Sequence, residues 1–235
     1  MSQANQPKPA LWLNGSGGNL ITELPKDRRL NILNLYSGIG GNRKLWGNSH
    51  NITAVEYDPK IAEIYQNLYP NDTVVVGCAL EYLLDNYEKF DFIWASPPCP
   101  SHSLARHWDA SFIDLSLYQI IIFLKKYYKG KFCVENVIPY YQYLIEPSNE
   151  IDRHSFWTNF NISGIKYQTK KDVNMEYSKI NDWQNILGIY LDDVCCKGVN
   201  KIKILRNCVN PKVGELILNQ AIKPKPTLLN WGVAE

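Results

Sequence analysis

Short apolar runs alternate with helical stretches between residues 30 and 137, and this alternation constrains the fold more than any other feature of the sequence. The apolar runs, which we predict to be strands, are residues 30–36, 52–56, 73–76, 90–95 and 131–137. Helices are expected between them, at residues 59–69, 78–87 and 115–128. Strands that alternate with helices favour a parallel sheet covered on both faces. We therefore expect an α/β protein.

A cysteine follows the fourth predicted strand on a stiff loop. Pro97 and Pro98 end that strand, because each proline fixes φ and removes a backbone donor. Cys99 comes directly after them, at the carboxyl end of a strand, where ligands bind in open α/β sheets. A thiol held there is a candidate nucleophile. A buried structural cysteine is the alternative, since cysteine is among the most buried residue types.

A glycine turn follows the first predicted strand. Residues 37–41 read Ser-Gly-Ile-Gly-Gly, and a helical stretch is expected after them at 42–46. Glycines between a strand and a helix let the backbone approach a ligand and point free N–H groups at it. The second strand ends in Glu56, at the place where an acid binds ribose hydroxyls in doubly wound sheets. A plain tight turn and a solvated strand-end acid are the alternatives.

The fifth predicted strand brings polar side chains to the same edge of the sheet. Glu135 and Asn136 lie near its carboxyl end, and parallel strands share that edge, so both lie near Cys99. Beyond residue 150 the pattern is less regular. We expect an antiparallel pair at 154–160 and 164–168, a polar, irregular segment at 169–203 with a short helix at 183–188, and a last helix at 211–222.

Length and composition exclude several classes of protein. A chain of 235 residues with 45% hydrophobic and 20% charged residues fits one globular domain with at most a small appendage. The net charge of +2 provides no overall basic field, so contact with nucleic acid needs a local patch. No apolar run reaches the ~18 residues of a membrane span, and the N-terminus lacks a signal-peptide pattern. Six cysteines without Cys-x-x-Cys spacing favour a reducing compartment and no zinc site.

Several motifs, in their order along the chain, resemble those of the cytosine-C5 DNA methyltransferases. Residues 36–41 are similar to the first motif of that family, with Tyr36 in place of the usual phenylalanine. Residues 96–100, Ser-Pro-Pro-Cys-Pro, are similar to the catalytic loop, and residues 135–137 match the Glu-Asn-Val motif. Residues 206–213 resemble the final motif, which returns to the cofactor pocket. The resemblance implies a Rossmann-like S-adenosylmethionine-dependent methyltransferase fold, with a mostly parallel sheet and an antiparallel edge.

The resemblance also implies a reaction. Cys99 would attack C6 of cytosine, which makes C5 nucleophilic enough to take a methyl group from S-adenosylmethionine and leave S-adenosylhomocysteine. Glu135 would supply a proton or hydrogen bond at N3, and Asn136 would fix the loop and the glutamate. Arg153 is expected to be the surviving arginine of the segment that supports the target base, with a surface salt bridge as the alternative. That base lies inside a duplex and must be flipped out.

A cofactor pocket is implied as well. Glu56 would hold the ribose, and Tyr36, Gly38 and Gly40 would shape the methionine side. The other expected cofactor-binding residues are Ser37, Gly41, Tyr57, Cys78, Ala79, Ser96, Pro98, Asn207 and Val209. Cys78 stands where the family usually carries an acid that hydrogen-bonds the adenine amino group, so adenine recognition would rest on packing and backbone contacts. No metal is expected.

The chain departs from the family most in size, because residues 169–203 are too few for a target-recognition domain of typical size. We predict an N-terminal extension at 1–29, with disorder at 1–9 and a hairpin within 10–24; a catalytic core at 30–168; a reduced target-recognition segment at 169–203; and a C-terminal helix and tail at 204–235. The lysines of the reduced segment contact phosphates or belong to a solvated loop; they are Lys170, Lys171, Lys197, Lys201 and Lys203. His102, Arg106 and His107 are expected to be solvated, with contacts to DNA as the alternative.

Three functions remain open from the sequence. The preferred one is a minimal DNA (cytosine-5-)-methyltransferase of a phage or mobile element, acting as a monomer in the cytoplasm of a prokaryotic or phage-infected cell. A short target site or a separate specificity protein would then supply its sequence preference. The second function keeps the chemistry with RNA as the substrate, which depends on contacts to the 2′-hydroxyl. The third is a catalytically silent nucleic-acid-binding relative, and the intact Cys99 and Glu135 count against it.

Overall fold

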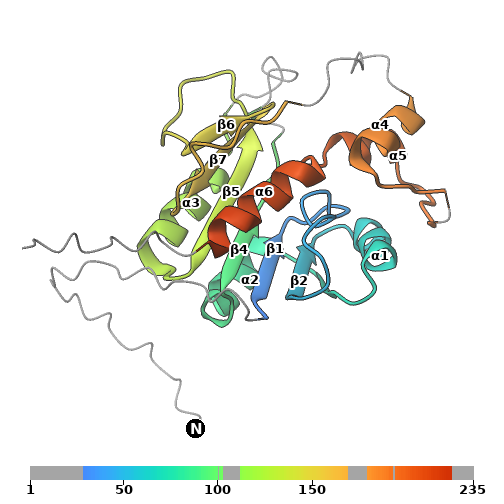
Figure 1. Cartoon of the computed structure of the whole chain (residues 1–235), viewed down its shortest axis with the longest axis horizontal. Helices are drawn as coiled ribbons and strands as arrows, with labels where there is room; N and C mark the ends of the chain where they lie inside the picture. Colours follow the sequence, from blue (N-terminus) through green and yellow to red (C-terminus); the bar gives the residue numbers. More distant parts are fainter. Residues whose placement is uncertain (1–28, 100, 103–111, 169–178, 193, 224–235) are drawn as a thin grey trace, which may run out of the picture.

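The computed structural model describes residues 29–99, 101–102, 112–168, 179–192 and 194–223, and every structural statement below concerns these residues (Figure 1). The disorder and hairpin predicted within residues 1–24 lie outside them. Arg106, His107, Lys170 and Lys171 lie outside them as well.

A seven-stranded sheet forms the centre of the fold, in the order β3-β2-β1-β4-β5-β7-β6. Its strands are β1 (Asn31–Leu35), β2 (Asn51–Glu56), β3 (Thr73–Val76), β4 (Phe92–Ala95), β5 (Lys131–Val137), β6 (Asn149–Ile151) and β7 (His154–Thr158). The first five strands pair in parallel, and β7 pairs antiparallel with both β5 and β6. The predicted α/β fold with a mostly parallel sheet and an antiparallel edge is therefore confirmed.

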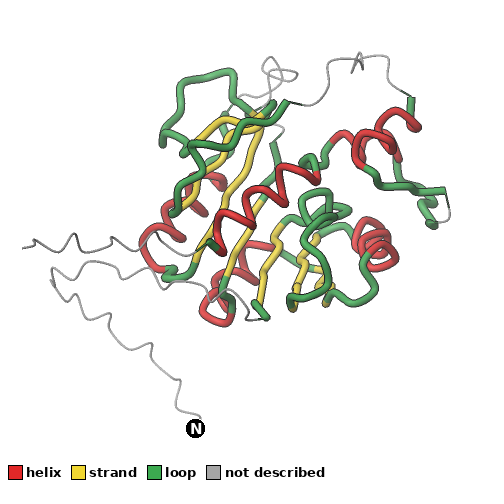
Figure 2. The backbone as a smooth tube through the Cα atoms, in the orientation of Figure 1, coloured by secondary structure: helices red, strands yellow, loops and turns green. Residues whose placement is uncertain are grey.

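Helices cover both faces of the sheet (Figure 2). They are α1 (Pro59–Leu68), α2 (Ala79–Asn86), the short 3-10 helix η1 (Tyr87–Lys89), α3 (Ser116–Tyr127), α4 (Ile180–Leu187), α5 (Lys201–Arg206) and α6 (Pro211–Ile222). On one face α6 packs against Trp94 and Phe156, and on the other α2 and α3 pack against Leu33 and Val134. Because the side chains of a strand alternate between faces, this double covering buries both faces of the inner strands, whose residues are mostly apolar.

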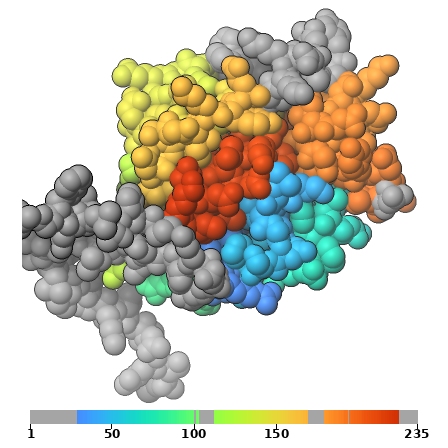
Figure 3. Space-filling view, viewed as in Figure 1, coloured from blue at the N-terminus to red at the C-terminus, as the bar shows by residue number. Residues whose placement is uncertain are grey.

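A separate apolar cluster joins α4 and α5 to the glycine turn. Trp183 and Leu187 of α4 and Leu205 of α5 are buried together with Ile39 of the turn and Ile64 of α1. In the space-filling view α4 and α5 (orange) lie against α6 (red) (Figure 3). These two helices belong to segments predicted to be largely irregular. The helix expected at 183–188 begins at Ile180 instead, and α5 was not predicted.

Two predicted elements are wrong. Residues 42–46 form turns rather than a helix, because their side chains bond to distant partners. The Asn42 amide donates to Asn34 of β1 at 2.9 Å, and the Arg43 guanidinium pairs with Asp72 in the loop before β3 at 2.7 Å. These tertiary contacts replace the local hydrogen bonds of a helix.

The predicted antiparallel partner of residues 154–160 is also wrong. β7 pairs with the preceding residues 149–151, not with 164–168, because Asp152 adopts a left-handed conformation (φ 60°) and reverses the chain. Residues 161–165 turn instead, with Ile162 and Ile165 buried in the cluster under α6.

In the described part of the chain, no helix has the length and apolar character that crossing a lipid bilayer requires.

Candidate active site

The proline loop after β4 is tied to the end of β5. The Asn136 side-chain amide donates to the Pro97 carbonyl at 3.0 Å, and its oxygen accepts from the Val137 amide at 2.9 Å. Because β4 and β5 are parallel neighbours, their carboxyl ends meet at one edge of the sheet, as predicted. Asn136 therefore holds the loop that carries Cys99.

Cys99 is half-buried at this edge, and its carbonyl accepts a hydrogen bond from the His102 amide at 3.0 Å. The His102 side chain is 1% exposed, so the expectation that it is a solvated loop residue is wrong. Its ring contacts Tyr141, from the segment that follows β5. This burial could not be predicted, because His102 and Tyr141 are far apart in the sequence.

Glu135 is a buried acid next to the proline loop. Burial raises the pKa of Glu135 to about 7, and a hydrogen bond from Ser96 and the charge of Arg153 oppose that rise. The Ser96 hydroxyl also accepts a hydrogen bond from the Trp94 indole at 2.8 Å. Ser96, expected in the cofactor pocket, thus joins the proline loop to the acid. A carboxyl group with a pKa near neutrality can hold a proton at pH 7 and donate it.

His154 was not among the predicted site residues, although it lies beside Glu135. Its Nε2 atom is 3.6 Å from Glu135 Oε1, and both side chains are buried. Burial, together with the charge of Arg153, lowers the pKa of His154 to about 3, so the imidazole is neutral. The pairing of β7 with β5 brings the two together, and that pairing follows from no motif in the sequence.

Arg153 lies between the catalytic edge and the α4–α5 helices. Its guanidinium donates to the carbonyl of Arg206 at the end of α5 and lies over the Trp183 ring, 5.6 Å from the ring centre. Its charge also acts on Glu135. These contacts join Arg153 to α4 and α5, within range of the Glu135 charge.

The glycine turn and Glu56 form a second group of site residues. The Gly38 amide donates to Glu56 Oε2 at 2.9 Å, and the Asp58 amide donates to Oε1 at 3.0 Å. Tyr36 and Gly38 both have φ near 53°, in the left-handed region that L-residues rarely adopt. The Ser37 hydroxyl is buried and has no hydrogen-bond partner within the described structure. The turn therefore fixes the Glu56 carboxylate and leaves the buried Ser37 hydroxyl available as a donor.

The segment before α6 packs directly on this turn. A Cβ atom added to Gly41 would lie 2.5 Å from the Cys208 Cβ and 2.7 Å from the Val209 carbonyl oxygen. A Cβ on Gly40 would lie 2.4 Å from the Tyr69 ring, whose hydroxyl donates to the Gly40 carbonyl at 2.8 Å. The return of the final motif to the glycine turn thus has a structural basis.

The remaining predicted cofactor residues lie at the same sheet edge, with one exception. Tyr57 and Pro98 are exposed, Cys78 is the exposed residue before α2, and Ala79 is the buried first residue of that helix. Burial raises the pKa of Tyr36 to about 12, with a further contribution from Cys78, so these two side chains lie near each other. Asn207 is exposed at the end of α5, and no described contact brings it to the glycine turn.

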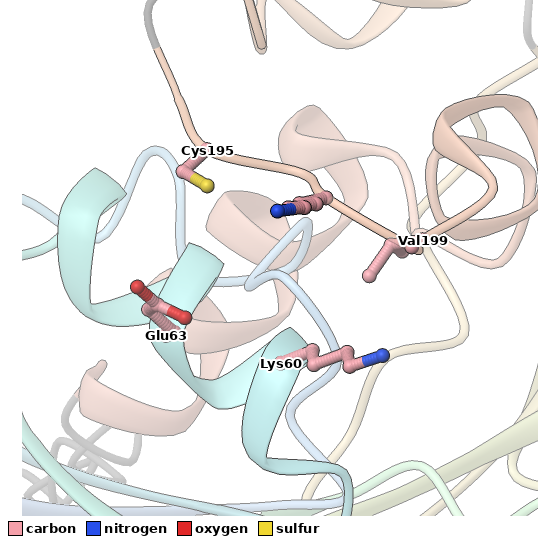
Figure 4. A pocket seen from close by; sticks show the side chains of 6 residues that line it. Lys60, Glu63, Cys195 and Val199 are labelled. Carbon is pink, nitrogen blue, oxygen red and sulfur yellow. The ribbon is translucent and has the colours of Figure 1, made fainter.

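A cavity of about 460 Å³ lies elsewhere, between α1 and residues 195–199 (Figure 4). Lys60 and Glu63 of α1 line it together with Cys195 and Val199. None of the residues that line it is a predicted catalytic or cofactor-binding residue. The candidate site is therefore the open sheet edge and not this cavity.

Comparison with known proteins identifies the family. The model of the C-5 cytosine-specific DNA methylases matches residues 30–174, more than half of the chain. A comparison with curated protein sequences found no match.

Similar solved structures include DNMT2 of Spodoptera frugiperda, in mutant form, at 24% identity and a TM-score of 0.36 over 46% of this chain and 35% of that one. The methyltransferase SMU.776, solved with S-adenosylhomocysteine, is 15% identical, with a TM-score of 0.35 over 48% of this chain and 32% of that one. A hypothetical protein of Thermus thermophilus, TTHA0928, is 13% identical, with a TM-score of 0.40 over 55% of this chain and 74% of that one. This chain thus spans about a third of the length of the first two.

S-adenosylmethionine is the methyl donor that the family implies, and the residues present fit it. The glycine turn, the fixed Glu56 carboxylate and the unpartnered Ser37 hydroxyl provide polar groups for a ribose and an amino-acid end. In the described part of the chain, no cluster of side chains suits a metal ion. With the family model matched over most of the sheet and the Rossmann-like fold observed, this chain belongs to the C-5 cytosine-specific DNA methylase family.

Proposed function

We propose that this protein is a DNA (cytosine-5-)-methyltransferase that methylates C5 of a flipped-out cytosine through a covalent bond between Cys99 and C6. The observation that supports this proposal best is the connection between Glu135 and the Cys99 loop. Ser96 bonds to Glu135, and Asn136 bonds to Pro97, so the acid and its neighbour are both joined to the loop that carries Cys99.

Cys99 would act first. Its thiolate adds to C6, the new C–S bond forms, and the electron pair moves through the ring toward N3. The carboxyl group of Glu135 donates its proton to N3, which neutralises the charge that develops there. Its pKa of about 7 makes the protonated form available near neutral pH. The ring is then an enamine with a nucleophilic C5.

S-adenosylmethionine supplies an electrophilic methyl group for that carbon. After methyl transfer, water takes the C5 proton, N3 returns its proton to the Glu135 carboxylate, and the Cys99 sulfur leaves C6 as a thiolate, which restores the aromatic ring. Asn136 would keep the proline loop in place during both steps, through its bond to the Pro97 carbonyl. Arg153 would contact the flipped base or stabilise the charge on Glu135, and its proximity to that acid supports either task.

The cofactor would lie across the glycine turn. Glu56 would accept hydrogen bonds from the ribose hydroxyls, because the amides of Gly38 and Asp58 hold its two oxygens without exhausting their lone pairs. Ser37, Gly38, Gly40 and Gly41 would line the methionine side. Tyr36, Tyr57, Cys78, Ala79, Ser96, Pro98 and Val209 complete the proposed pocket.

DNA is the proposed substrate, bound by a monomer with a limited recognition surface. Lys197 and Lys203 are exposed near α5 and would contact phosphates. Lys201 has a structural contact instead, since its ammonium group donates to the Leu191 carbonyl at 2.8 Å. In the described part of this segment, two exposed lysines provide little sequence-specific contact, so we propose a short target site or a separate specificity protein.

A methyl-transfer assay on matched substrates tests this function. Wild-type protein is incubated with tritiated S-adenosylmethionine and one of three substrates: duplex DNA, the same strand alone, or RNA of the same sequence. We expect label in duplex DNA, recovered as 5-methylcytosine after digestion, and none with Cys99→Ala. Label confined to RNA would overturn the choice of DNA, and transfer by Cys99→Ala at the wild-type rate would overturn the covalent mechanism.

A further inference from the structure

We propose that His102 is a positioning residue for Cys99. It holds the turn that carries this thiol through its hydrogen bond to Tyr141, which is in turn bonded to Tyr118. The inference rests on the function proposed above, in which Cys99 is the nucleophile. His102 does not contact the reacting atoms in this account. It acts by fixing the backbone on which Cys99 stands.

The backbone of the turn is held on both sides of Cys99. The His102 amide donates to the Cys99 carbonyl at 3.0 Å, and the Tyr140 amide donates to the His102 carbonyl at 3.3 Å. On the other side, Asn136 donates to the Pro97 carbonyl at 3.0 Å. Asn136 lies near the end of β5 and Tyr140 just after it, so the end of this strand and the residues that follow fix the loop before and after the thiol.

The His102 side chain extends this anchoring into the core. Its Nδ1 atom is hydrogen-bonded to the Tyr141 hydroxyl, and the Tyr118 hydroxyl donates to Tyr141 at 3.3 Å. Tyr118 is a buried residue of α3, and its hydroxyl also accepts from the Leu144 amide at 3.4 Å. Because Tyr118 donates to Tyr141, the Tyr141 proton is available for Nδ1. The chain of donors thus runs from α3 to the catalytic turn.

The other ring nitrogen does not hold His102 in place. Nε2 is buried and has no hydrogen-bond partner within the described structure. Burying a nitrogen without a partner costs free energy, because the nitrogen loses its hydrogen bond to water. Burial lowers the pKa of His102, against an opposing contribution from Asp114, so the ring is neutral in the folded protein. The bond from Nδ1 to Tyr141 is therefore the polar contact that retains this ring in the core.

Loss of the anchor should slow chemistry more than it weakens binding. A displacement of a reacting group by about 1 Å can cost roughly 100-fold in rate. No described contact joins His102 to the glycine turn or to Glu56, so cofactor affinity should change little. This separation distinguishes positioning of Cys99 from general damage to the fold.

Four variants test the proposal. Tyr141→Phe removes only the hydroxyl that holds Nδ1. His102→Asn keeps a polar group at the position of Nδ1, whereas His102→Gln keeps one at the position of Nε2. Tyr143→Phe is the control, because the Tyr143 hydroxyl bonds to Glu150 and Ser155 and not to His102. For each variant, single-turnover methyl transfer, S-adenosylhomocysteine affinity, melting temperature and hydrogen exchange of the peptides containing His102 and Tyr140 are measured.

We expect Tyr141→Phe and His102→Gln to lower kcat by at least about tenfold, with the KM for S-adenosylmethionine within about twofold of wild type. His102→Asn should recover most of the loss, and Tyr143→Phe should resemble wild type. Exchange at the His102 and Tyr140 amides should accelerate in the two impaired variants only. Equal losses in His102→Asn and His102→Gln, or a wild-type kcat in Tyr141→Phe, would overturn the proposal.

The exchange measurement keeps this test separate from the proposed function. If wild-type protein transfers no methyl group to any nucleic acid, the proposed function fails. Faster exchange in Tyr141→Phe but not in Tyr143→Phe would then still establish that His102 anchors the turn. Unchanged exchange in Tyr141→Phe would reject the anchor even in an active enzyme.

Discussion

His154 Nε2 lies 3.6 Å from Glu135 Oε1, and near neutral pH these two buried side chains are not an ion pair. Burial, with the charge of Arg153, lowers the pKa of His154 to about 3, while burial raises the pKa of Glu135 to about 7. Each shift favours the uncharged form of the residue. The edge of the sheet therefore holds a neutral imidazole against a carboxyl group that exchanges its proton near pH 7, and both properties have measurable consequences.

Replacement of His154 should remove part of the sensitivity of the protein to acid. The unfolded chain binds a proton at His154 below about pH 6.5, whereas the folded protein does not until about pH 3, so stability is lost between these values. At pH 4 the loss is about 3 kcal/mol. We expect the difference in unfolding free energy between pH 7 and pH 4 to shrink by about that amount in His154→Leu, as measured by urea unfolding. An unchanged difference would mean that His154 is already charged in the folded state.

The buried Glu135 should give the unfolding free energy a pH dependence of the opposite sign, which Glu135→Gln should remove. The folded protein retains a proton on Glu135 up to about pH 7, whereas the unfolded chain releases it near pH 4.5, so wild-type stability falls as pH rises through that window. The expected fall is about 3 kcal/mol, and it should be absent in Glu135→Gln. Glu150→Gln is the control, because Glu150 is exposed on the neighbouring strand β6.

The same substitution should affect the reaction. Methyl transfer by the wild-type protein should decline above about pH 7, because Glu135 then loses the proton that it donates to N3. We expect Glu135→Gln to be slower by roughly 10²–10⁴-fold and to lack this decline. A pH–rate profile of single-turnover methyl transfer measures both. A decline that persists unchanged in Glu135→Gln would assign it to another group.

Gly41→Ala should weaken cofactor binding through packing alone. The added Cβ would lie 2.5 Å from the Cys208 Cβ and 2.7 Å from the Val209 carbonyl oxygen, so the glycine turn and the segment before α6 must move apart. We expect a stability loss of roughly 1–3 kcal/mol and S-adenosylhomocysteine affinity lower by at least about tenfold, measured by calorimetry. Gly164→Ala has open space around its Cβ and should match wild type. Equal affinities of Gly41→Ala and Gly164→Ala for S-adenosylhomocysteine would show that the packing of the final motif on the glycine turn does not affect the cofactor pocket.

Cys78→Asp should strengthen cofactor binding. Cys78 is exposed before α2 near Tyr36, at the position where related enzymes carry an acid. A hydrogen bond from the adenine amino group to a carboxylate would be worth about 1.5–3 kcal/mol, so we expect at least about tenfold tighter binding of S-adenosylhomocysteine. Cys195→Asp introduces the same charge at an exposed thiol beside the separate cavity and should have no such effect. A weaker or unchanged affinity in Cys78→Asp would remove position 78 from the adenine site.

The elements that could be predicted from the sequence are those in which a continuous run of residues shows a clear pattern of buried apolar side chains. β3, β5 and α6 begin and end at the predicted residues, because their periodicity and the flanking glycines and prolines reflect local preferences. The helix predicted at residues 42–46 is wrong because Asn42 and Arg43 bond to Asn34 and Asp72. Local helix propensity contains no information about such distant partners. β6 is too short, with three residues, to produce a pattern.

In the candidate site, too, local motifs could be predicted from the sequence, whereas contacts between distant residues could not. Cys99, Glu135, Asn136 and the glycine turn could be found from motifs, because each has a fixed residue order. Their connections could not be predicted. The Ser96–Glu135 bond depends on the spacing of β4 and β5. The contact of His154 with Glu135 depends on the register of β7, and the burial of His102 depends on Tyr141 and Tyr118. Each joins residues whose proximity arises only after the sheet has formed.

The most direct test of the proposed chemistry is covalent trapping on duplex DNA that contains 5-fluorocytosine. Fluorine at C5 cannot leave as a proton does, so the bond between the Cys99 sulfur and C6 would persist after methyl transfer. With S-adenosylmethionine present, we predict a denaturation-resistant protein–DNA adduct that peptide mass spectrometry assigns to Cys99 and that Cys99→Ala does not form. Absence of an adduct in protein shown to bind S-adenosylhomocysteine, or an adduct at another cysteine, would contradict the proposed mechanism.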